Sequence, residues 1–167
     1  MKRNFNNRNK SLSELGHEFL VVCPSCQQCA EVTPLGSTNP YMIGIKCRMI
    51  CSHCGHIKEM LPKTNVCRNR VKVSHSHYWK ENTIRIGGPF DWYFGLPAYL
   101  QLTCCGHTLW AYNLEHLEYI ESYVRSELRN PHPNNRSIES RLPKWIKSAK
   151  NREHLLKCIG HLKQSIS

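Results

Sequence analysis

Two pairs of cysteines with matching spacing constrain the fold of this chain more than any other feature. The first pair is Cys23-Pro-Ser-Cys26 and the second is Cys51-Ser-His-Cys54, which Gly55 follows. Two intervening residues let a tight turn aim both thiolates at one cation, and four thiolates complete tetrahedral Zn²⁺ coordination with no open position. Gly55 suits the left-handed conformation that often follows such a pair. The pattern predicts a zinc ribbon, in which a structural zinc replaces much of the missing core.

Neighbouring residues leave the ligand set partly open. Cys29 forms a further pair with Cys26 at the same spacing, and His53 or His56 could replace one thiolate. Cys47 is assigned to the core of a strand instead, because it alternates with apolar residues. Cys29 is interpreted as a neighbour of the site rather than a ligand. The preferred zinc ligands are Cys23, Cys26, Cys51 and Cys54.

The cysteine content and the lack of long apolar runs indicate the compartment. Ten cysteines occur among 167 residues, and the chain starts with a basic, Asn-rich stretch that no apolar run follows. A secretory signal peptide is therefore not expected, and no run approaches the roughly 18 apolar residues of a membrane-spanning helix. We expect a cytoplasmic protein without membrane association, whose reduced thiols are available to a metal.

The order of sequence patterns predicts an α+β fold with an N-terminal zinc ribbon, a small antiparallel sheet and C-terminal helices. Residues 1–17 are expected to form a flexible basic tail and residues 18–62 the ribbon. Residues 63–167 are expected to form the small antiparallel sheet with two to three C-terminal helices. Within the ribbon, alternation predicts a strand with one apolar face made by Ile43, Ile45, Cys47 and Met49.

The second part of the chain contains a hairpin pattern followed by helical patterns. Strand-like residues flank Cys104-Cys-Gly-His107, which is typical of a hairpin with a tight turn. A helix should begin after Asn113 as N-cap and stop at Asn130-Pro131. A further helix or helix pair should begin near Pro143 and restart near Asn151. The apolar stripe of the first helix is Leu114, Leu117, Ile120, Val124 and Leu128.

Seven aromatic residues lie within the two predicted hairpin strands or just before the first of them. They could stack on unpaired bases, but a small domain needs a core, so we interpret them as the core of the second sheet under the first helix. They are Phe90, Trp92, Tyr93, Phe94, Tyr99, Trp110 and Tyr112.

A second group of metal-ligand types is present outside the ribbon. Cys104 and His107 have two residues between them, while Cys67, His75 and His77 share one face if their strand continues. A mixed set of nitrogen and sulfur ligands suits zinc. The simpler interpretation, which we favour, is a hairpin turn with a buried cysteine and surface histidines.

The sequence offers little for catalysis. Asp91 is the only Asp in the chain, which excludes a metal centre built on two Asp residues, and no nucleophile-elbow motif is present. A metalloenzyme would need a second zinc site with an open position. Its ligands would be Cys104, Cys105, His107 and either His75 or His77. An enzyme is therefore the less favoured interpretation.

The charge balance favours a polyanionic partner. The chain has 23 Lys and Arg against 12 Asp and Glu, a formal net charge of +11. Rows of basic side chains can follow a phosphate backbone, although each row alone could also be a solvated surface. The candidate nucleic-acid-binding residues are Lys46, Arg48, Arg68, Arg70, Lys72, Arg141, Lys144, Lys147 and Lys150.

Several strings of residues suggest a family. They are Phe94-Gly-Leu-Pro97, Cys104-Cys-Gly-His107, Leu109-Trp-Ala-Tyr-Asn113, His116-Leu117 and the string from Ser140 to Arg152. With the cysteine pairs, they resemble bacterial proteins described as containing a transcription factor IIB-type zinc ribbon, over residues 18–163. The resemblance implies a metal site in the ribbon. Gln27 departs from the glycine that usually follows the first pair.

These features predict a zinc-ribbon protein that binds nucleic acid, DNA before RNA, in a regulatory or accessory role. Zinc would order the ribbon and the basic rows would contact phosphates, without sequence specificity. One alternative is a protein–protein adaptor whose ribbon docks on a larger nucleic-acid machine, and another is the metalloenzyme with a second zinc site.

Overall fold

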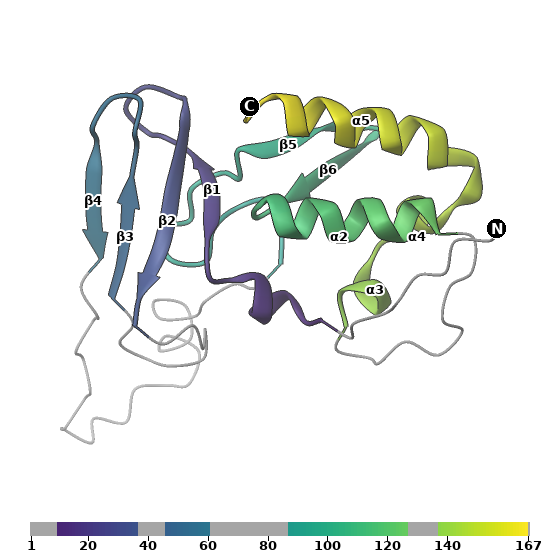
Figure 1. Cartoon of the computed structure of the whole chain (residues 1–167), viewed down its shortest axis with the longest axis horizontal. Coiled ribbons are helices and arrows are strands. Elements are labelled where there is room, and N and C mark those ends of the chain that lie inside the picture. The colour runs from purple at the N-terminus through teal and green to yellow at the C-terminus, as the bar shows by residue number, and fades with distance from the viewer. Residues whose placement is uncertain (1–9, 37–45, 61–86, 127–136, 167) are drawn as a thin grey trace, which may run out of the picture.

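The expected α+β fold is confirmed by a computed structural model, which describes residues 10–36, 46–60, 87–126 and 137–166 (Figure 1). A four-stranded antiparallel sheet of order β1-β2-β3-β4 forms one side of the molecule, and a two-stranded hairpin with helices forms the other. The elements are η1 (Leu12–Leu15), β1 (Phe19–Val22), β2 (Cys29–Leu35), β3 (Lys46–Ile50), β4 (Ile57–Met60), β5 (Leu100–Cys104), β6 (His107–Ala111), α2 (Leu114–Arg125), α3 (Ile138–Arg141), α4 (Lys144–Lys147), η2 (Ala149–Asn151) and α5 (Arg152–Gln164).

The four-stranded sheet is the ribbon that the cysteine spacing predicts. Cys47 and Met49 of β3 are fully buried while Lys46 is exposed, so the predicted alternation is confirmed for this strand. Ile43 and Ile45 lie outside the described residues. Because neighbouring strands run in opposite directions, the β1–β2 and β3–β4 turns lie at the same end of the sheet, which is what places both cysteine pairs together.

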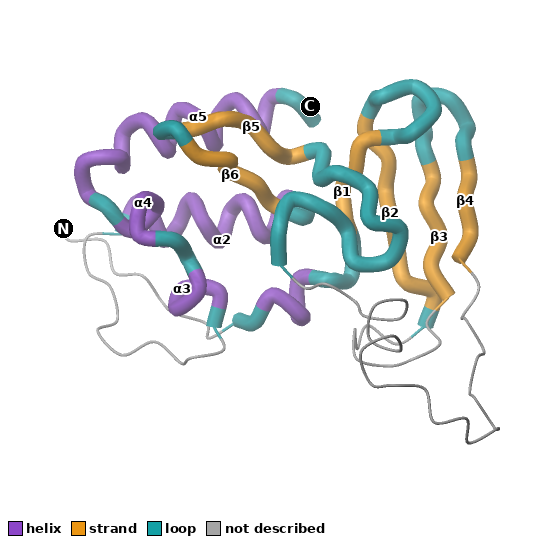
Figure 2. Tube along the Cα trace, turned by 180° about the vertical axis from the view of Figure 1, so that it is seen from behind, coloured by secondary structure: helices purple, strands orange, loops and turns teal. Residues whose placement is uncertain are grey.

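The second part is a hairpin packed against two helices. β5 and β6 pair across the turn Cys105-Gly106, whose φ angles of 52° and 75° are those of a two-residue type I′ turn. The hairpin contacts both α2 and α5, and these helices contact each other (Figure 2). Their apolar faces and the hairpin bury one continuous core around Leu117, Leu155 and Ile159. None of the helices in the described ranges is long and apolar enough to cross a bilayer.

Helix α2 confirms its predicted N-cap and corrects its stripe. The Asn113 side chain accepts a hydrogen bond from the His116 N–H at 2.9 Å. Leu117, Ile120 and Val124 are buried, but Leu114 is 40% exposed, because the buried arc also takes in His116, Tyr119 and Tyr123 and is therefore centred away from Leu114. The helix ends at Arg125, earlier than predicted. Leu128 and Asn130-Pro131 lie outside the described residues.

Five of the seven aromatic residues lie in or against the ribbon's core rather than under α2 as expected: Trp92, Tyr93, Phe94, Trp110 and Tyr112. Trp92 and Tyr112 pack edge-on against Phe19 of β1, with ring centroids 4.9 and 5.0 Å away, inside the ribbon's own core. The reason is that residues from the second part of the chain cover the free edge of β1. The Leu20 N–H donates to the Tyr112 carbonyl, and the Tyr99 N–H donates to the Leu20 carbonyl. The ribbon is thus completed by residues from the second part.

Residues 10–17 belong to the folded unit rather than to a tail. Ser11 begins the short helix η1 with a capping box to Glu14, and Leu15 is fully buried in the hairpin–helix core. The Asn113 side chain also donates to the Leu15 carbonyl at 2.9 Å. The N-cap of α2 therefore joins the start of the described chain to the second part.

Candidate metal centre

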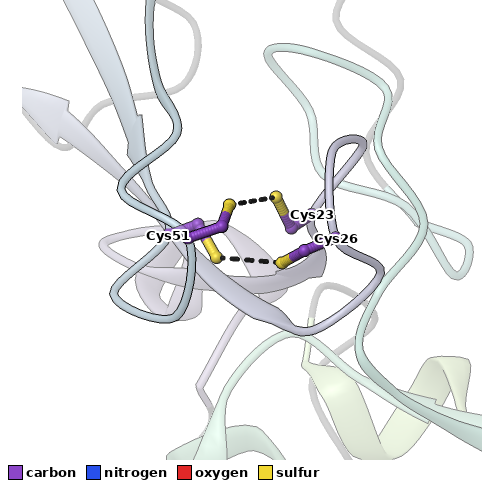
Figure 3. Close-up of side chains that lie close together, drawn as sticks. Cys23, Cys26 and Cys51 are labelled. Atoms are coloured by element: carbon purple, nitrogen blue, oxygen red, sulfur yellow. Dashed lines mark hydrogen bonds between the residues drawn. The ribbon is translucent and has the colours of Figure 1, made fainter.

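The four cysteines of the two pairs meet at one end of the ribbon. Cys23 and Cys26 lie in the β1–β2 turn, and Cys51 and Cys54 lie in the β3–β4 turn. The labelled side chains of Cys23, Cys26 and Cys51 point toward a common gap between the two turns (Figure 3). The first cysteine of each turn is fully buried, whereas Cys54 is exposed. The sequence prediction of this set of four is therefore matched by their positions.

The two turns have the same backbone hydrogen bonds. In each, the N–H of the first cysteine donates to the carbonyl five residues later, at 2.8 Å for Cys23 and 2.9 Å for Cys51. The residue four positions later donates back to that cysteine's carbonyl. This residue is left-handed in both turns, with φ of 62° at Gln27 and 73° at Gly55. Gln27 thus adopts the conformation of the glycine it replaces.

The sulfur positions fit a tetrahedral metal ion. The Cys23 and Cys54 sulfurs are 3.7 Å apart, the Cys26 and Cys51 sulfurs are 3.6 Å apart, and all four lie within 4.8 Å of one another. Zn–S bonds of about 2.3 Å in a tetrahedron imply sulfur–sulfur edges of about 3.8 Å. The four cysteines could therefore hold one metal ion with little rearrangement.

The electrostatics of the cluster also favour a cation. Burial raises the pKa of the Cys23 thiol, but hydrogen bonds from the Cys26 and Ser25 N–H groups outweigh it and lower the pKa to about 7. The Gln28 N–H lowers the pKa of Cys26, but burial and the neighbouring thiols raise it to about 12. One thiolate is thus favoured and further negative charge is opposed, unless a positive ion compensates it.

The other ligand types near the ribbon do not join this group. Cys29 begins β2, and its carbonyl accepts a bond from the Cys51 thiol at 3.6 Å. Burial raises the pKa of the Cys29 thiol to about 11, and its sulfur is not in the group of mutually close ligand atoms. His53 and His56 are also absent from the set of mutually close ligand atoms.

Asp91 begins a third turn that shares the first backbone hydrogen bond and the left-handed fifth residue of the cysteine turns, which the sequence reasoning missed. The Asp91 N–H donates to the Leu96 carbonyl at 2.9 Å, and Phe90 bridges to Pro97. The Asp91 carboxylate is 1% exposed. Burial raises the pKa of this carboxyl, although the hydrogen bonds that it accepts lower it in part. They come from the N–H groups of Tyr93, Phe94 and Leu96 at 2.8, 2.7 and 2.6 Å. The available signal was spacing, since Asp91 precedes Gly95 as Cys51 precedes Gly55.

The second metal group, which the sequence offered as the less favoured alternative, is assembled differently. Cys104 does lie in a cluster of ligand atoms, but its neighbours are His154 and Cys158 of α5. His107 is not in that cluster, because its ring stacks on Trp145 with centroids 5.0 Å apart. Cys67, His75 and His77 lie outside the described residues. The missed signal was the spacing of His154 and Cys158, which puts both on one helix face.

The candidate phosphate-binding residues have varied surroundings. Lys46 is exposed, whereas Arg48 pairs with Glu59 of the neighbouring strand at 2.7 Å. Arg141, Lys144, Lys147 and Lys150 lie on three short elements, α3, α4 and η2. The chain leaves the helical conformation between these elements, at Leu142 with ψ of 133° and at Ser148 with ψ of 126°. Arg68, Arg70 and Lys72 lie outside the described residues.

The C-terminal basic residues are mostly accessible. Arg141, Lys144 and Lys150 are exposed, while Lys147 is half-buried and donates to the Ser140 carbonyl at 3.2 Å. Three of the four side chains could therefore contact a partner without breaking a contact within the protein.

Comparisons of the chain with protein-family models, with curated proteins and with solved structures find no match.

Proposed function

We propose that this protein is a zinc-ribbon protein that binds nucleic acid, DNA before RNA, in a regulatory or accessory role. The observation that carries the proposal is the tetrahedral spacing of four cysteine sulfurs in a chain with a net charge of +11. Zinc would lock the two turns together, and exposed basic side chains would contact phosphates. The resemblance to bacterial proteins with a transcription factor IIB-type zinc ribbon agrees with this proposal.

The choice of zinc follows from the ligands. Four thiolates in a tetrahedron suit zinc or iron, and a complete set of four protein ligands leaves no position for a substrate. The site would therefore be structural. Elemental analysis of purified protein should find at least one zinc per chain, and the protein should be colourless, since an iron–thiolate centre absorbs visible light. A stoichiometric iron content would contradict this assignment. Reduced thiols at this site also support a cytoplasmic location.

Binding of nucleic acid would be driven by phosphate contacts. Each contact releases counterions from the polyanion, so the logarithm of the affinity falls with that of the salt concentration by about 0.9 per phosphate on duplex DNA. Lys144 and Lys150 are exposed and belong to the C-terminal basic group, which supports a role there. Lys46 lies at the start of β3, at the end of the ribbon opposite the cysteine turns.

The test is fluorescence anisotropy of zinc-loaded protein with labelled duplex DNA, single-stranded DNA and RNA of one sequence, each titrated with salt. We expect the tightest binding to duplex DNA and a steep salt dependence. The variant Lys144→Gln/Lys150→Gln should lower the salt slope by about two. The control Lys157→Gln/Lys163→Gln removes the same formal charge, but both lysines are paired with glutamates. No binding at low salt would overturn the proposal.

A protein adaptor is the second candidate, and one observation favours it. Ile50 and Ile57 are directly paired across β3 and β4 next to the second cysteine turn, yet they are 41% and 59% exposed. Such a pair suits contact with an apolar surface of a larger nucleic-acid machine. Partner binding of this kind would be insensitive to salt, and Ile57→Lys would abolish it while leaving DNA affinity unchanged or slightly higher.

A further inference from the structure

A second cluster of metal-ligand atoms lies in the hairpin–helix part, away from the ribbon. Cys104 ends strand β5, and His154 and Cys158 are four residues apart on α5, which runs against β5 (Figure 1). Their ligand atoms all lie within 4.8 Å of one another. Residues four apart share one helix face, so the helix presents both ligands to the same strand end.

The cluster is half inside the protein. Cys104 is 1% and Cys158 is 6% exposed, whereas His154 is on the surface. Two buried sulfurs under a surface imidazole leave an open side through which an ion can enter. Cys104 and Cys158 are free thiols at the edge of the hairpin–helix core, beside Leu155, Ile159 and Leu162 of α5.

The neighbouring turn supplies an independent observation. Cys105 occupies a left-handed position with φ of 52°, where Asn or Gly is preferred, and its sulfur lies 3.9 Å from that of Cys104. A non-glycine residue there strains the backbone, and retained strain is found most often near functional sites. The hairpin tip thus places a further thiol near the cluster, but Cys105 is not in the group of mutually close ligand atoms.

We propose that Cys104, His154 and Cys158 form a second binding site for a divalent ion of the zinc type. One imidazole nitrogen and two sulfurs are ligands that zinc accepts readily, and they disfavour magnesium and calcium, which prefer oxygen. Three protein ligands leave the fourth position to water or another small ligand, unlike the closed set of four in the ribbon. The second ion should therefore be held more weakly and exchange faster.

This site differs from the set that the sequence suggested. Only Cys104 is common to both, and His107 is engaged with Trp145 instead. The proposal does not rest on nucleic-acid binding or on the ribbon ion, because the two clusters share no residue. Failure of either can therefore be recognised without affecting the other.

The experiment is native mass spectrometry of the full chain, reduced and then titrated with zinc. We expect two ions per chain for the wild type. His154→Ala and Cys158→Ser should each lose one ion or weaken its binding by at least tenfold. His161→Ala is the matched control for the first, because His161 is also exposed on α5. Cys105→Asn is the control for the second, because it removes a nearby thiol and suits the type I′ turn.

Four outcomes decide the proposal. Two ions in the wild type and in both controls, with one in His154→Ala, would support it. A single ion in the wild type would overturn it, as would two tightly held ions in both test variants. Loss of the second ion in Cys105→Asn would overturn the three-ligand assignment. Because His154 is exposed, the His154→Ala variant should fold normally. It can therefore decide the test even if Cys158→Ser does not fold.

A redox reading is checked in the same samples. If Cys104 and Cys158 form a disulfide that persists under the reducing conditions, the mass falls by two hydrogens and the second ion is absent, which overturns the metal site. Cobalt offers a second readout of the wild type: the second equivalent should add a weaker thiolate-to-metal absorption than the first, because it has two sulfur ligands rather than four.

Discussion

The two cysteine turns and the Asp91 turn have similar backbones, but they are stabilised in two different ways. In all three, the residue before the turn pairs with the residue after it: Val22 with Cys29, Ile50 with Ile57, and Phe90 with Pro97. In all three, the residue at the fifth position is left-handed, as φ of 69° at Gly95 shows for the last. What differs is the acceptor at the first position.

The comparison teaches what this turn requires. Its N–H groups point inward at the first side chain, where a buried acceptor must satisfy them. At Cys23 that acceptor is sulfur, which receives the N–H groups of Ser25 and Cys26. At Asp91 it is a carboxylate, which receives the equivalent N–H groups of Tyr93 and Phe94 and also that of Leu96. The carboxylate turn is complete by itself, whereas the cysteine turns would be joined by the ion that we propose for them.

Removing the metal should give the largest effect and separate the two kinds of turn. Structural zinc contributes on the order of 10 kcal/mol of folding free energy in small zinc domains. After chelation, we expect the amides of residues 23–28 and 51–56 to exchange with solvent much faster, as measured by hydrogen exchange. The Tyr93, Phe94 and Leu96 amides should keep most of their protection. Equal loss at all three turns would contradict the comparison.

Removing the Asp91 carboxylate tests the other kind of turn. Asp91→Ala leaves three half-buried N–H groups without their acceptor, which should cost about 3–6 kcal/mol of unfolding free energy. Asp91→Asn keeps one oxygen and should cost about 1–3 kcal/mol. Urea unfolding followed by circular dichroism gives both values, with Glu118→Ala as the control, since Glu118 is an exposed carboxylate on α2. A loss for Asp91→Ala no larger than for the control would refute this role.

Lowering the pH should destabilise the part of the protein around the Asp91 turn, because His116 nearby becomes protonated. This ring is 2% exposed, and its Nδ1 accepts the Tyr112 N–H at 3.3 Å, while Tyr112 accepts a bond from Trp92 of the Asp91 turn. Burial lowers the pKa of His116 from 6.5 to about 4. Between pH 6.5 and pH 4, His116 is therefore protonated in the unfolded chain but neutral in the folded protein. The stability that depends on neutral His116 is complete above pH 6.5 and is lost as the pH falls toward 4.

The expected loss over that range is about 3 kcal/mol. His116→Gln keeps an acceptor for the Tyr112 N–H but does not titrate. Denaturation midpoints of the wild type should therefore fall more steeply between pH 6.5 and pH 4 than those of the variant, with zinc in excess for both. Protonation of the cysteine thiolates affects both proteins alike. Parallel pH curves would show that His116 is not the responsible group.

Local patterns predicted most of this fold, and long-range contacts account for what they missed. The spacing of Cys23, Cys26, Cys51 and Cys54 specifies a set of four because each pair is held by its own turn. By contrast, Cys104 meets His154 only because α5 folds back on β5, an arrangement that no local pattern records.

The aromatic residues illustrate the same limit. A core role for Trp92 follows from composition and size, but its packing against Phe19 depends on the contact between β1 and residues 97–99. Likewise, the sequence shows that Asp91 and Gly95 are four residues apart. Only the hydrogen bonds show that the Asp91 carboxylate accepts from the N–H groups that bond to sulfur in the Cys23 turn.

Exchanging the residues at the left-handed position should give the smallest effect and sharpen the comparison between the two cysteine turns. A side chain in this conformation costs roughly 1–2 kcal/mol, partly offset by the greater freedom of glycine in the unfolded chain. Gln27→Gly should therefore stabilise the zinc-loaded protein by about 1 kcal/mol, and Gly55→Gln should destabilise it by a similar amount. A Cβ at Gly55 would meet no atom within 4 Å, so the cost there is conformational alone. Chemical denaturation of both variants at saturating zinc measures the pair; if Gln27→Gly were destabilising, the Gln27 side chain would have to make a contact that outweighs its strained backbone.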